Sequence, residues 1–470
     1  MTSRDPLSDD PFAIPADTLG MDPATMRRLG QKVVDMVVDR LERRNTEAVI
    51  TTGDAADLTA RLGGPLQDAP SDPDAALDLL AEVALTNMQH GDHPRYFARV
   101  PGPAAFAATL GDWLGTGFNT ICASWGGGSG PAVVETTVCT WIARMLGLPA
   151  HTEGVLLSGG SLANFTGFCV ARSEIGTGVA YLTDQTHASL PRNLRQMGLA
   201  PNQIRILPSD DALRMSAETL SQAIAEDIAA GRRPMMVVAT AGSTNTGATD
   251  PLDAIADLCA AHDIWLHVDG AYGAPAAITD QGRATLAGLS RADSVVLDPH
   301  KWFFQPYDVG LCLVTRPGAL DRCFSMNPEY LRDVQATSGE VNYGNRSLEL
   351  SRRSRALKLW MSLRTHGAQA FRDAVQRGIE LAELTEEHLR QHPDTWEVIT
   401  PAQLGIVCFA HRGSDAADHA ARAARVSASG FATLSSTMLK DRSALRLCTI
   451  NPLTTQDDIT RTLDMLAAPL

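Results

Sequence analysis

A lysine and an aspartate stand beside strongly apolar segments and could carry chemistry there. Lys301 lies between the apolar segment 294–297 and the aromatic residues 302–304. A lysine in such surroundings is desolvated, which lowers its pKa and leaves free amine to attack a carbonyl group. Asp269 closes the mostly apolar segment 264–268. Because an unpaired buried carboxylate is costly, we expect Asp269 to meet a cation, a metal or a helix N-terminus.

Two further sites could hold an anion and a flat ring. The stretch from Ser158 to Ser161 runs through Gly159 and Gly160 into a helical pattern. Glycines let the backbone approach a ligand, and the unpaired N–H groups of a helix N-terminus favour an anion such as phosphate. A glycine turn closed by a serine cap is the structural alternative. His187 follows another apolar segment, and its ring could cover an aromatic ligand or serve only as a structural hydrogen-bonding group.

Together, these groups supply what pyridoxal 5'-phosphate requires of a protein. The phosphate needs an anion seat, the aldehyde needs a lysine for a Schiff base, and the pyridinium nitrogen needs a carboxylate that keeps it protonated. His267 and Asp269 would share one strand face, so a metal site is the alternative, but no third ligand stands nearby and we expect no metal. The motifs G-x-x-x-x-G-K-[ST] and G-x-S-x-G are absent, as is G-x-G-x-x-G after a strand.

Seven short apolar segments alternate with helical patterns from residue 154 onward. Several are apolar on both faces, as in strands of a parallel sheet that helices cover on both sides. We therefore predict a large α/β domain with a mostly parallel seven-stranded sheet, whose ligands bind at the carboxyl ends of the strands. The predicted strands are Val155–Ser158, Val179–Thr183, Ile204–Leu207, Met235–Thr240, Ile264–Asp269, Ser294–Asp298 and Gly310–Thr315.

Helical segments flank this sheet on both sides in the sequence. Apolar residues recur at helical spacing from Asp22 to Leu41, and a second helix is predicted from Asp74 to Met88. A helix with alternating arginine and apolar positions is predicted at Leu348–His366, followed by a charged helix from about 368 to 392. The predicted domains are a helical arm at 1–104, the large domain at 105–358 and a small α/β domain at 359–470.

Composition and charge narrow the class of protein. The 470 residues are 44% hydrophobic and 20% charged, which permits a large core and argues against a disordered or coiled-coil chain. Basic residues number 40 and acidic residues 54, so the net charge of -14 argues against nucleic acid and anionic lipid as partners. The eight cysteines are scattered, and no apolar run approaches the roughly 20 residues that span a bilayer. We expect reduced thiols, no membrane segment and a cytoplasmic location.

Motifs between about residues 92 and 367 resemble those of the group II pyridoxal-phosphate-dependent decarboxylases, the family of aromatic-L-amino-acid, glutamate and tyrosine decarboxylases. Several matches in order are more specific than one short motif. The resemblance implies fold type I, the fold of aspartate aminotransferase. It also implies α-decarboxylation of an L-amino acid to an amine and CO2, nearest to the aromatic type. The motifs are His93–Phe97, Gly159–Ser161, Asp184–Ser189, Ala239–Thr244 with Asp250–Pro251, His267–Tyr272 and Pro299–Trp302.

The same resemblance implies roles for individual residues. Lys301 would form the Schiff base, Asp269 would pair with the pyridine nitrogen, and His187 would stack on one ring face. Tyr330 matches the loop tyrosine that protonates the carbanion after CO2 leaves, and the presence of both His187 and Tyr330 favours decarboxylation over oxidation to an aldehyde. The other contacts would be Gly160 and Ser161, which would hold the phosphate, and Ala271, which would pack on the second ring face. Thr244 would support the contact that Asp269 makes, and His300 would lie near the phosphate or the substrate carboxylate.

Two departures from the family pattern bear on the pocket. The family usually has asparagine where this chain has Asp298, whose carboxylate would repel a nearby phosphate unless it turns away or is protonated. Aromatic-substrate members carry pocket-lining aromatic residues where this chain has Arg99, Val100 and Ala123. Arg99 could pair with an acidic substrate side chain or be a solvated rim residue, so an aliphatic or acidic substrate is the alternative.

Three other classes of protein would use part of this residue set. An aminotransferase or carbon–sulfur lyase would share Lys301 and Asp269 but normally binds the α-carboxylate with a dedicated arginine. A serine hydrolase would need G-x-S-x-G, and a non-catalytic binding protein would not need the complete lysine, aspartate, histidine and tyrosine set. The resemblance also implies an oligomeric state. In this family the N-terminal helices wrap around a second subunit, so the apolar face of helix 22–41 predicts a homodimer; packing on its own chain is the alternative.

Overall fold

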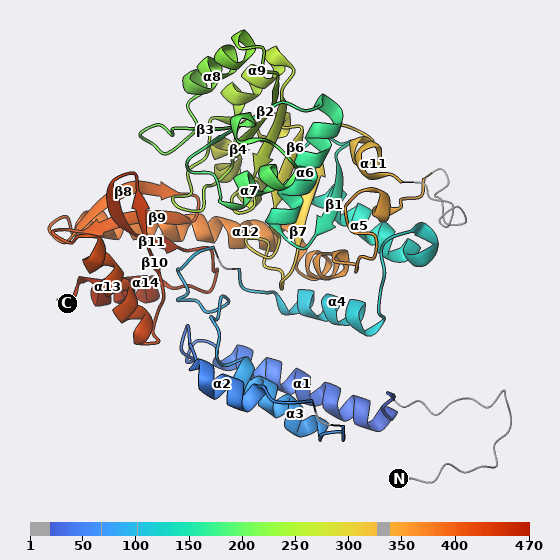
Figure 1. Ribbon diagram of the computed structural model, residues 1–470. Coiled ribbons are helices and arrows are strands. Elements are labelled where there is room, and N and C mark those ends of the chain that lie inside the picture. Colours follow the sequence, from blue (N-terminus) through green and yellow to red (C-terminus); the bar gives the residue numbers. More distant parts are fainter. Residues whose placement is uncertain (1–18, 67, 101, 327–338) are drawn as a thin grey trace. The chain divides into compact units, whose positions relative to one another are not determined.

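Two compact units make up the described part of the chain (Figure 1). The smaller unit is helical, and the larger unit contains two β-sheets. The smaller comprises residues 51–89 with the described residues before 48, and the larger comprises residues 48–50 and 90–470. This computed structural model describes residues 19–66, 68–100, 102–326 and 339–470.

A seven-stranded sheet forms the centre of the larger unit. Its strand order is β1-β7-β6-β5-β4-β2-β3, and among these strands β7 alone runs opposite to the other six. The predicted α/β fold with a mostly parallel sheet is confirmed, because every predicted strand forms within two residues of its predicted ends. The strands are β1 (Glu153–Leu157), β2 (Val179–Thr183), β3 (Ile204–Leu207), β4 (Pro234–Thr240), β5 (Trp265–Asp269), β6 (Ser294–Leu297) and β7 (Gly310–Val314).

Helices cover both faces of this sheet. Successive side chains of a strand point to opposite faces, so Leu156 and Leu266 enter one apolar cluster while Val155 and Val238 enter another. Both faces are therefore buried, as the apolar strand sequences predicted. The first cluster includes residues of α5 (Trp125–Met145), α8 (Ala217–Ala229), α9 (Leu252–His262) and α12 (Ala356–Gln391), and the second those of α6 (Gly160–Ile175) and α7 (Ser189–Gln196).

The long helical element α12 differs from its prediction at its start and agrees with it at an internal break. It begins at Ala356, so the prediction of a helix over residues 348–355 was wrong. The alternation of arginine and apolar residues there reflects a buried arginine, since Arg352 points inward and pairs with Glu135 of α5. The expected break between two helices near residue 367 is confirmed, because Gly367 leaves the helical conformation with a φ of +73° and ψ of 163°, and two helical stretches meet there at a kink.

A four-stranded antiparallel sheet follows α12, in the order β10-β11-β9-β8. Helix α12 contacts β8 and β9 as well as α4 (Phe106–Gly117) and α5, so it connects the packing of the two sheets. The domain boundaries near residues 104 and 358 stay predictions. The C-terminal elements are β8 (Trp396–Gln403), β9 (Ile406–His411), α13 (Ala416–Ala428), β10 (Ser435–Leu439), β11 (Arg442–Cys448) and α14 (Gln456–Ala467).

The smaller unit consists of α1 (Pro23–Arg43), α2 (Ala55–Leu62) and α3 (Pro73–Leu79). Asp22 caps α1 by accepting hydrogen bonds from the N–H groups of Ala24 and Thr25, which confirms the predicted start of this helix. The predicted helix from Asp74 to Met88 was wrong in its second half, because α3 gives way to a single π-helical turn at Leu80–Ala84.

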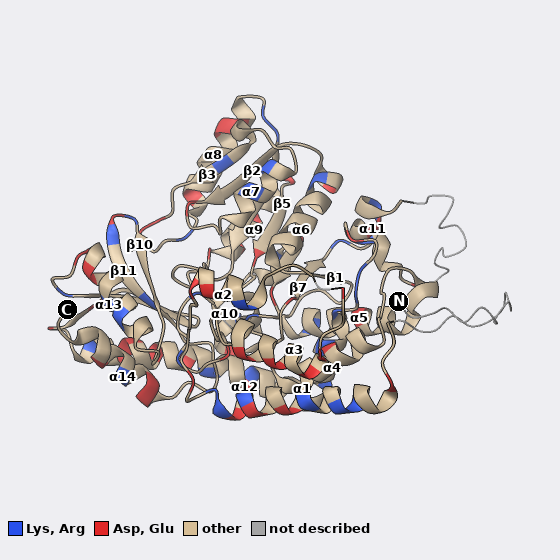
Figure 2. Cartoon of the chain, turned by 60° about the horizontal axis from the view of Figure 1, so that its bottom comes forward, with Lys and Arg blue, Asp and Glu red and all other residues tan. Residues whose placement is uncertain are grey.

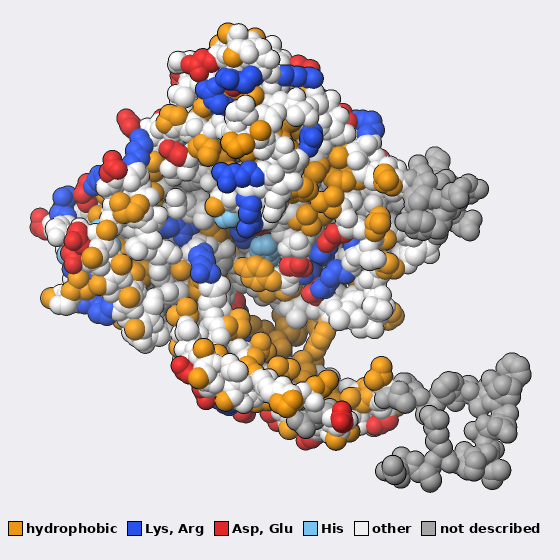
Figure 3. All heavy atoms as spheres, viewed as in Figure 1, with side chains coloured by type: hydrophobic (Ala, Val, Ile, Leu, Met, Phe, Trp, Pro, Cys, Tyr) orange, Lys and Arg blue, Asp and Glu red, His pale blue; other side chains and the backbone are white. Residues whose placement is uncertain are grey.

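Charged side chains hold α1 to α3. Arg28 and Lys32 of α1 form ion pairs with Asp74, and Lys32 also reaches Asp78 at 2.7 Å. Arg28 holds the pKa of Asp74 down to about 2. Basic and acidic residues are interspersed along α1 (Figure 2), and hydrophobic side chains lie among the charged ones on the surface (Figure 3). Within the described ranges, no helix has both the length and the apolar character needed to cross a membrane.

Candidate active site

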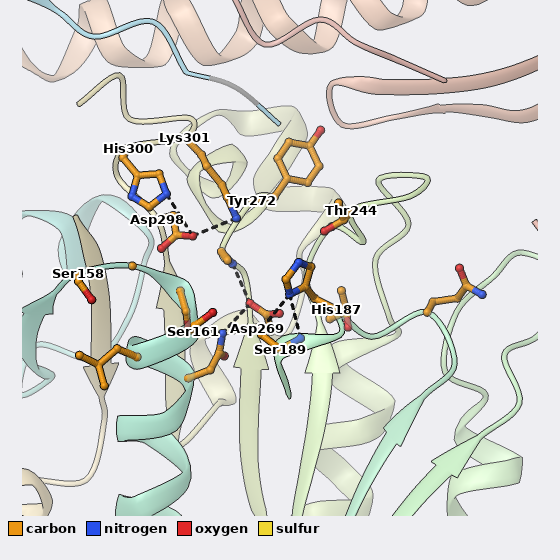
Figure 4. A pocket seen from close by; sticks show the side chains of 18 residues that line it. Ser158, Ser161, His187, Ser189, Thr244, Asp269, Tyr272, Asp298, His300 and Lys301 are labelled. Atoms are coloured by element: carbon orange, nitrogen blue, oxygen red, sulfur yellow. Dashed lines mark hydrogen bonds and ion pairs between the residues drawn. The ribbon is translucent and has the colours of Figure 1, made fainter. Parts of the chain in front are cut away.

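The carboxyl ends of five parallel strands, β1, β2, β4, β5 and β6, border a cavity of about 330 Å³. This is the edge at which doubly wound sheets bind ligands. Figure 4 shows side chains from several of these strand ends converging on the cavity. Tyr330, the predicted proton donor, lies outside the described residues. The other predicted site residues all line the cavity: Gly160, Ser161, His187, Thr244, Asp269, Ala271, His300 and Lys301.

Lys301 lies in the turn that follows β6. Its backbone N–H donates to the carbonyl of Asp298, and its Nζ lies 3.0 Å from Oδ2 of the same residue (Figure 4). Burial lowers the pKa of Lys301, but the carboxylates of Asp298 and Asp269 outweigh it and raise the pKa above its usual value. The expected lowering was therefore wrong, because apolar neighbours in the sequence do not reveal two acidic groups that converge in space.

Asp298 and His300 share the turn with the lysine. Nε2 of His300 lies 3.6 Å from Oδ2 of Asp298, and its Nδ1 accepts a hydrogen bond from the N–H of Val309 at 3.2 Å. The ring packs against Tyr307 with centroids 4.6 Å apart. Burial lowers the pKa of His300, so the imidazole is neutral at pH 7, with its proton on the nitrogen that faces Asp298.

Asp269 ends β5 and is 6% exposed. Its Oδ1 accepts hydrogen bonds from the backbone N–H of Ala271 at 3.1 Å and from Nδ2 of Asn164 at 3.3 Å. Burial raises the pKa of Asp269, while these two donors and the charge of Lys301 act in the opposite direction. The carboxylate is thus built to face a positively charged or N–H-bearing ligand group.

The N-terminus of α6 forms one wall of the cavity. Gly159 has a φ of +157°, and a β-carbon on Gly160 would lie 2.7 Å from Oδ2 of Asp298. Only glycine leaves room for this close approach. The first-turn N–H groups of a helix have no partner within the helix, so Gly160 and Ser161 offer an anion seat. Asn193 of α7 steadies this end by donating to the carbonyl of Ser161 at 2.6 Å.

His187 and Thr244 stand on the opposite side of the site from α6 (Figure 4). Nδ1 of His187 lies 2.8 Å from the hydroxyl of Ser189, which leaves the face of the ring for a ligand. Thr244 lines the cavity, and its backbone carbonyl accepts from Nε of Arg446 at 2.9 Å. In the described chain, Asp269 receives its hydrogen bonds from Asn164 and Ala271, so Thr244 does not support it through one.

Three buried polar atoms of the cavity wall have no hydrogen-bond partner among the described residues. They are Oδ1 of Asp298, Oγ1 of Thr240 and Oε1 of Gln185. Unpaired buried polar groups are costly, so they indicate a polar ligand. A phosphate seat, a lysine amine and a buried carboxylate around a space of this size fit pyridoxal 5'-phosphate.

The alternative of a metal at His267 and Asp269 fails on geometry. Nδ1 of His267 is hydrogen-bonded to Ser294 and Nε2 to Asn164, each at 2.7 Å, so neither nitrogen is left for a metal. Asn164 was missed as a site residue by the sequence analysis. It stands one helical turn after Gly160, so its side chain had to face the same strand ends.

Comparison with known proteins agrees with this geometry. Residues 64–412 match the model of the pyridoxal-dependent decarboxylase conserved domain. The chain is 41% identical over 457 residues to the aromatic-L-amino-acid decarboxylase of Bacillus atrophaeus, covering 94% of this chain and 95% of that protein.

Two solved structures share the fold over nearly the whole chain. Oryza sativa TDC with PLP and tryptamine has a TM-score of 0.89 at 26% identity, covering 95% of this chain and 97% of that one. Catharanthus roseus tryptophan decarboxylase in complex with L-tryptophan has a TM-score of 0.88 at 27% identity, covering 95% and 98%. The predicted fold type, cofactor and class of enzyme, a carboxy-lyase, are confirmed. The chain belongs to the family of pyridoxal-dependent decarboxylases.

Proposed function

We propose that this enzyme removes the α-carboxylate of an aromatic L-amino acid as CO2 and releases the amine. The observation that carries the proposal is the convergence of Lys301 and Asp269, from the ends of neighbouring strands, on one cavity beside the N-terminus of α6. When bound, pyridoxal 5'-phosphate supplies an electron sink for the bond between the α-carbon and the carboxylate.

The residues of the cavity would hold the two ends of the cofactor. Lys301 would bond covalently to its aldehyde carbon, and the first-turn N–H groups at Gly160 and Ser161 would bind its phosphate. Asp269 would hold a proton on the ring nitrogen, because a buried carboxylate stabilises a positive charge next to it. His300 would contact the phosphate or the substrate carboxylate.

Other groups would enclose the ring and complete proton transfer. His187 would cover one ring face and Ala271 the other, with Thr244 at the edge, which excludes water from the reacting bond. Tyr330 would donate a proton to the α-carbon after CO2 has left. With Tyr330 outside the described residues, its role rests on the motif alone.

An aromatic substrate is supported by the similarity to the Bacillus atrophaeus enzyme, which extends over nearly the full length of both chains. The alternative of an acidic substrate rests on the charge of Arg99, which is not among the residues that line the cavity. Val100 is buried in the core next to Arg99, so it does not by itself select for an aromatic ring.

Release of CO2 from a panel of amino acids tests the proposed reaction. The purified holoenzyme is given each of the common amino acids, dopa and 5-hydroxytryptophan, and CO2, amine, aldehyde and keto acid are measured. We expect CO2 and amine in equal amounts from aromatic amino acids. Keto acid without CO2 would indicate an aminotransferase, and CO2 from acidic amino acids alone would favour the second substrate class.

We also propose a homodimer in the cytoplasm. Exposed apolar side chains on α4, with Phe118 80% exposed just after it, support a surface that a second subunit covers. All eight cysteines are free thiols and six are buried, which suits a reducing compartment.

A further inference from the structure

A chain of buried polar side chains leads from β6 through β5 to the carboxylate of Asp269. Trp265, His267 and Asp269 alternate along β5, so their side chains leave the strand on one face, toward α6. Ser294 of β6 lies opposite His267 in the register of the two strands. Asn164 of α6 completes the chain, and none of the five residues is more than 6% exposed.

The neighbours of the Asn164 amide determine its orientation. Its Nδ2 lies 2.8 Å from the carbonyl oxygen of Gly160 and 3.3 Å from Oδ1 of Asp269. Both atoms are acceptors, so only the NH2 group, with its two hydrogens, can face them. Oδ1 of Asn164 therefore faces Nε2 of His267 at 2.7 Å, and this ring nitrogen carries the proton.

The other nitrogen of His267 is an acceptor. Burial lowers the pKa of His267 to about 3, so the ring is neutral. Nδ1 lies 2.7 Å from Oγ of Ser294, and the same oxygen accepts the indole N–H of Trp265 at 2.8 Å. Because an indole nitrogen can only donate, Ser294 uses its own hydrogen toward His267. The donors thus all point in one direction, from Trp265 to Asp269.

Packing against α6 holds the imidazole in this position. A β-carbon on Gly167 would lie 2.6 Å from Cε1 of His267, so the ring fills the space that a larger residue would need. The ring of Phe168 stands edge-on to it, with centroids 4.9 Å apart. A ring enclosed in this way keeps its N–H directed at Asn164.

We propose that Asn164, held by His267, is a positioning residue that keeps Asp269 ionised and directed at the ring nitrogen of the cofactor. The inference rests on the proposed function, in which Asp269 pairs with that nitrogen. Asn164 and Ala271 both donate to Oδ1, and no other hydrogen bond within the described residues reaches this carboxylate, so Oδ2 is left for the ligand. A donor fixed by a neutral chain favours the carboxylate form without adding charge to the cavity.

The protonation of the cofactor's ring nitrogen tests this inference. Holoenzyme is prepared with pyridoxal 5'-phosphate carrying 15N in the ring, and the 15N chemical shift reports whether this nitrogen is protonated. We expect a protonated nitrogen in the unmodified enzyme. Asn164→Leu keeps the side-chain size but cannot donate. In this variant the ratio of protonated to unprotonated nitrogen should fall about 10-fold to 100-fold, as for the loss of a hydrogen bond to a charged group.

Two substitutions of the histidine provide an independent test and a rescue. His267→Phe keeps a ring of similar bulk but removes both nitrogens, so it should reproduce the change of Asn164→Leu. His267→Gln offers one donor and one acceptor and should restore most of the protonated form. If Asn164→Leu does not fold, these two variants still test whether His267 and Asn164 keep the ring nitrogen protonated.

Two further variants distinguish a failure of this inference from a failure of the proposed function. Val268→Ala shortens a buried side chain on the opposite face of β5 and should leave the shift unchanged; a change as large as that of Asn164→Leu would overturn the inference. Asp269→Asn should deprotonate the nitrogen. If it does so while Asn164→Leu and His267→Phe keep the normal shift, the inference fails and the proposed function stands. An unchanged shift in Asp269→Asn would instead remove Asp269 from its proposed role.

Discussion

Asp298 gives the cavity a second carboxylate beside the reactive lysine. Its Oδ2 lies 3.0 Å from Nζ of Lys301, and its Oδ1 is buried without a partner in the described chain. The same Oδ2 would lie 2.7 Å from a β-carbon on Gly160, so this acid also borders the proposed phosphate seat. Asp298 is therefore a counter-ion toward Lys301 but a like charge toward a bound phosphate.

Asp298→Asn should tighten the binding of pyridoxal 5'-phosphate. Like charges a few ångströms apart in a partly hydrated site repel by about 1 kcal/mol, so Kd should fall roughly fivefold. Titration of the apoprotein with the cofactor, followed by absorbance, measures this. Asp184→Asn removes an exposed carboxylate from the loop after β2 and should leave Kd unchanged. Equal or weaker binding by Asp298→Asn would show that the acid turns away from the phosphate or binds it in protonated form.

Single residues of the site could be predicted where a polar group interrupts an apolar stretch. Lys301 and Asp269 meet that condition, and because the carboxyl ends of parallel strands share one edge of a sheet, they could be expected at one site before the strand order was known. The structure shows that their strands are neighbours. The raised pKa of Lys301 could not be predicted, because it depends on how closely the turn after β6 brings Asp298 to the amine. Thr240 is an ordinary strand residue in sequence, and only the open space beside its hydroxyl identifies it as part of the site.

At the scale of elements, the strands were predictable and the entry into α12 was not. The strands of the central sheet are buried on both faces, so a short apolar run bounded by glycine or a polar residue is enough to locate each one. Residues 348–355 carry arginines at spacings that also suit a helix. Their non-helical conformation depends on a residue far away in the sequence. That residue is Glu135, which draws the guanidinium of Arg352 into the core.

The Glu135–Arg352 pair joins α5 and β1 to the segment before α12. Arg352 donates to both carboxylate oxygens, at 2.7 and 2.8 Å, and also to the carbonyls of Cys122 and Leu156. Glu135 in turn accepts from the N–H of Leu156 at 2.9 Å. Neither charged side chain is exposed to solvent, so each depends on the other for its charge to be balanced.

Glu135→Gln should lower the free energy of unfolding by about 3–5 kcal/mol, because it leaves the charge of Arg352 buried without its counter-charge. Urea unfolding followed by circular dichroism measures the loss. Asp457→Asn, which breaks the exposed pair of Asp457 with Arg461, is the matched control and should be close to neutral. A change in Glu135→Gln no larger than that of the control would mean that the pair contributes little.

For the whole molecule, the class of fold and the cofactor could be predicted from the sequence. The oligomeric state depends on which apolar side chains stay exposed on the surface of the folded chain. Within the larger unit, Trp113, Leu114 and Phe118 are exposed at or next to α4. Leu80 and Leu85 are exposed in the smaller unit. Exposed apolar groups of this kind are typical of surfaces that another subunit covers.

Sedimentation of the holoenzyme tests the homodimer. We predict a dimer for the unmodified enzyme and a shift toward monomer for Phe118→Asp, because a charge at an apolar interface opposes association. The side chain is exposed within the chain, so the melting temperature of the monomer should change little. Ile206→Asp, at an exposed apolar position on the edge strand β3, should remain dimeric. An active monomer in the unmodified enzyme would rule out the dimer.

Covalent mapping of the cofactor tests the assignment of the cavity most directly. The chain has only four lysines, Lys32, Lys301, Lys358 and Lys440. All four lie in the described ranges, and of them only Lys301 lines the cavity. The holoenzyme is reduced with borohydride and digested, and its peptides are weighed by mass spectrometry. We predict the pyridoxyl phosphate group on the peptide that contains Lys301 and none on any peptide of Lys301→Ala. A group on Lys32, Lys358 or Lys440, or no group at all, would contradict the proposal.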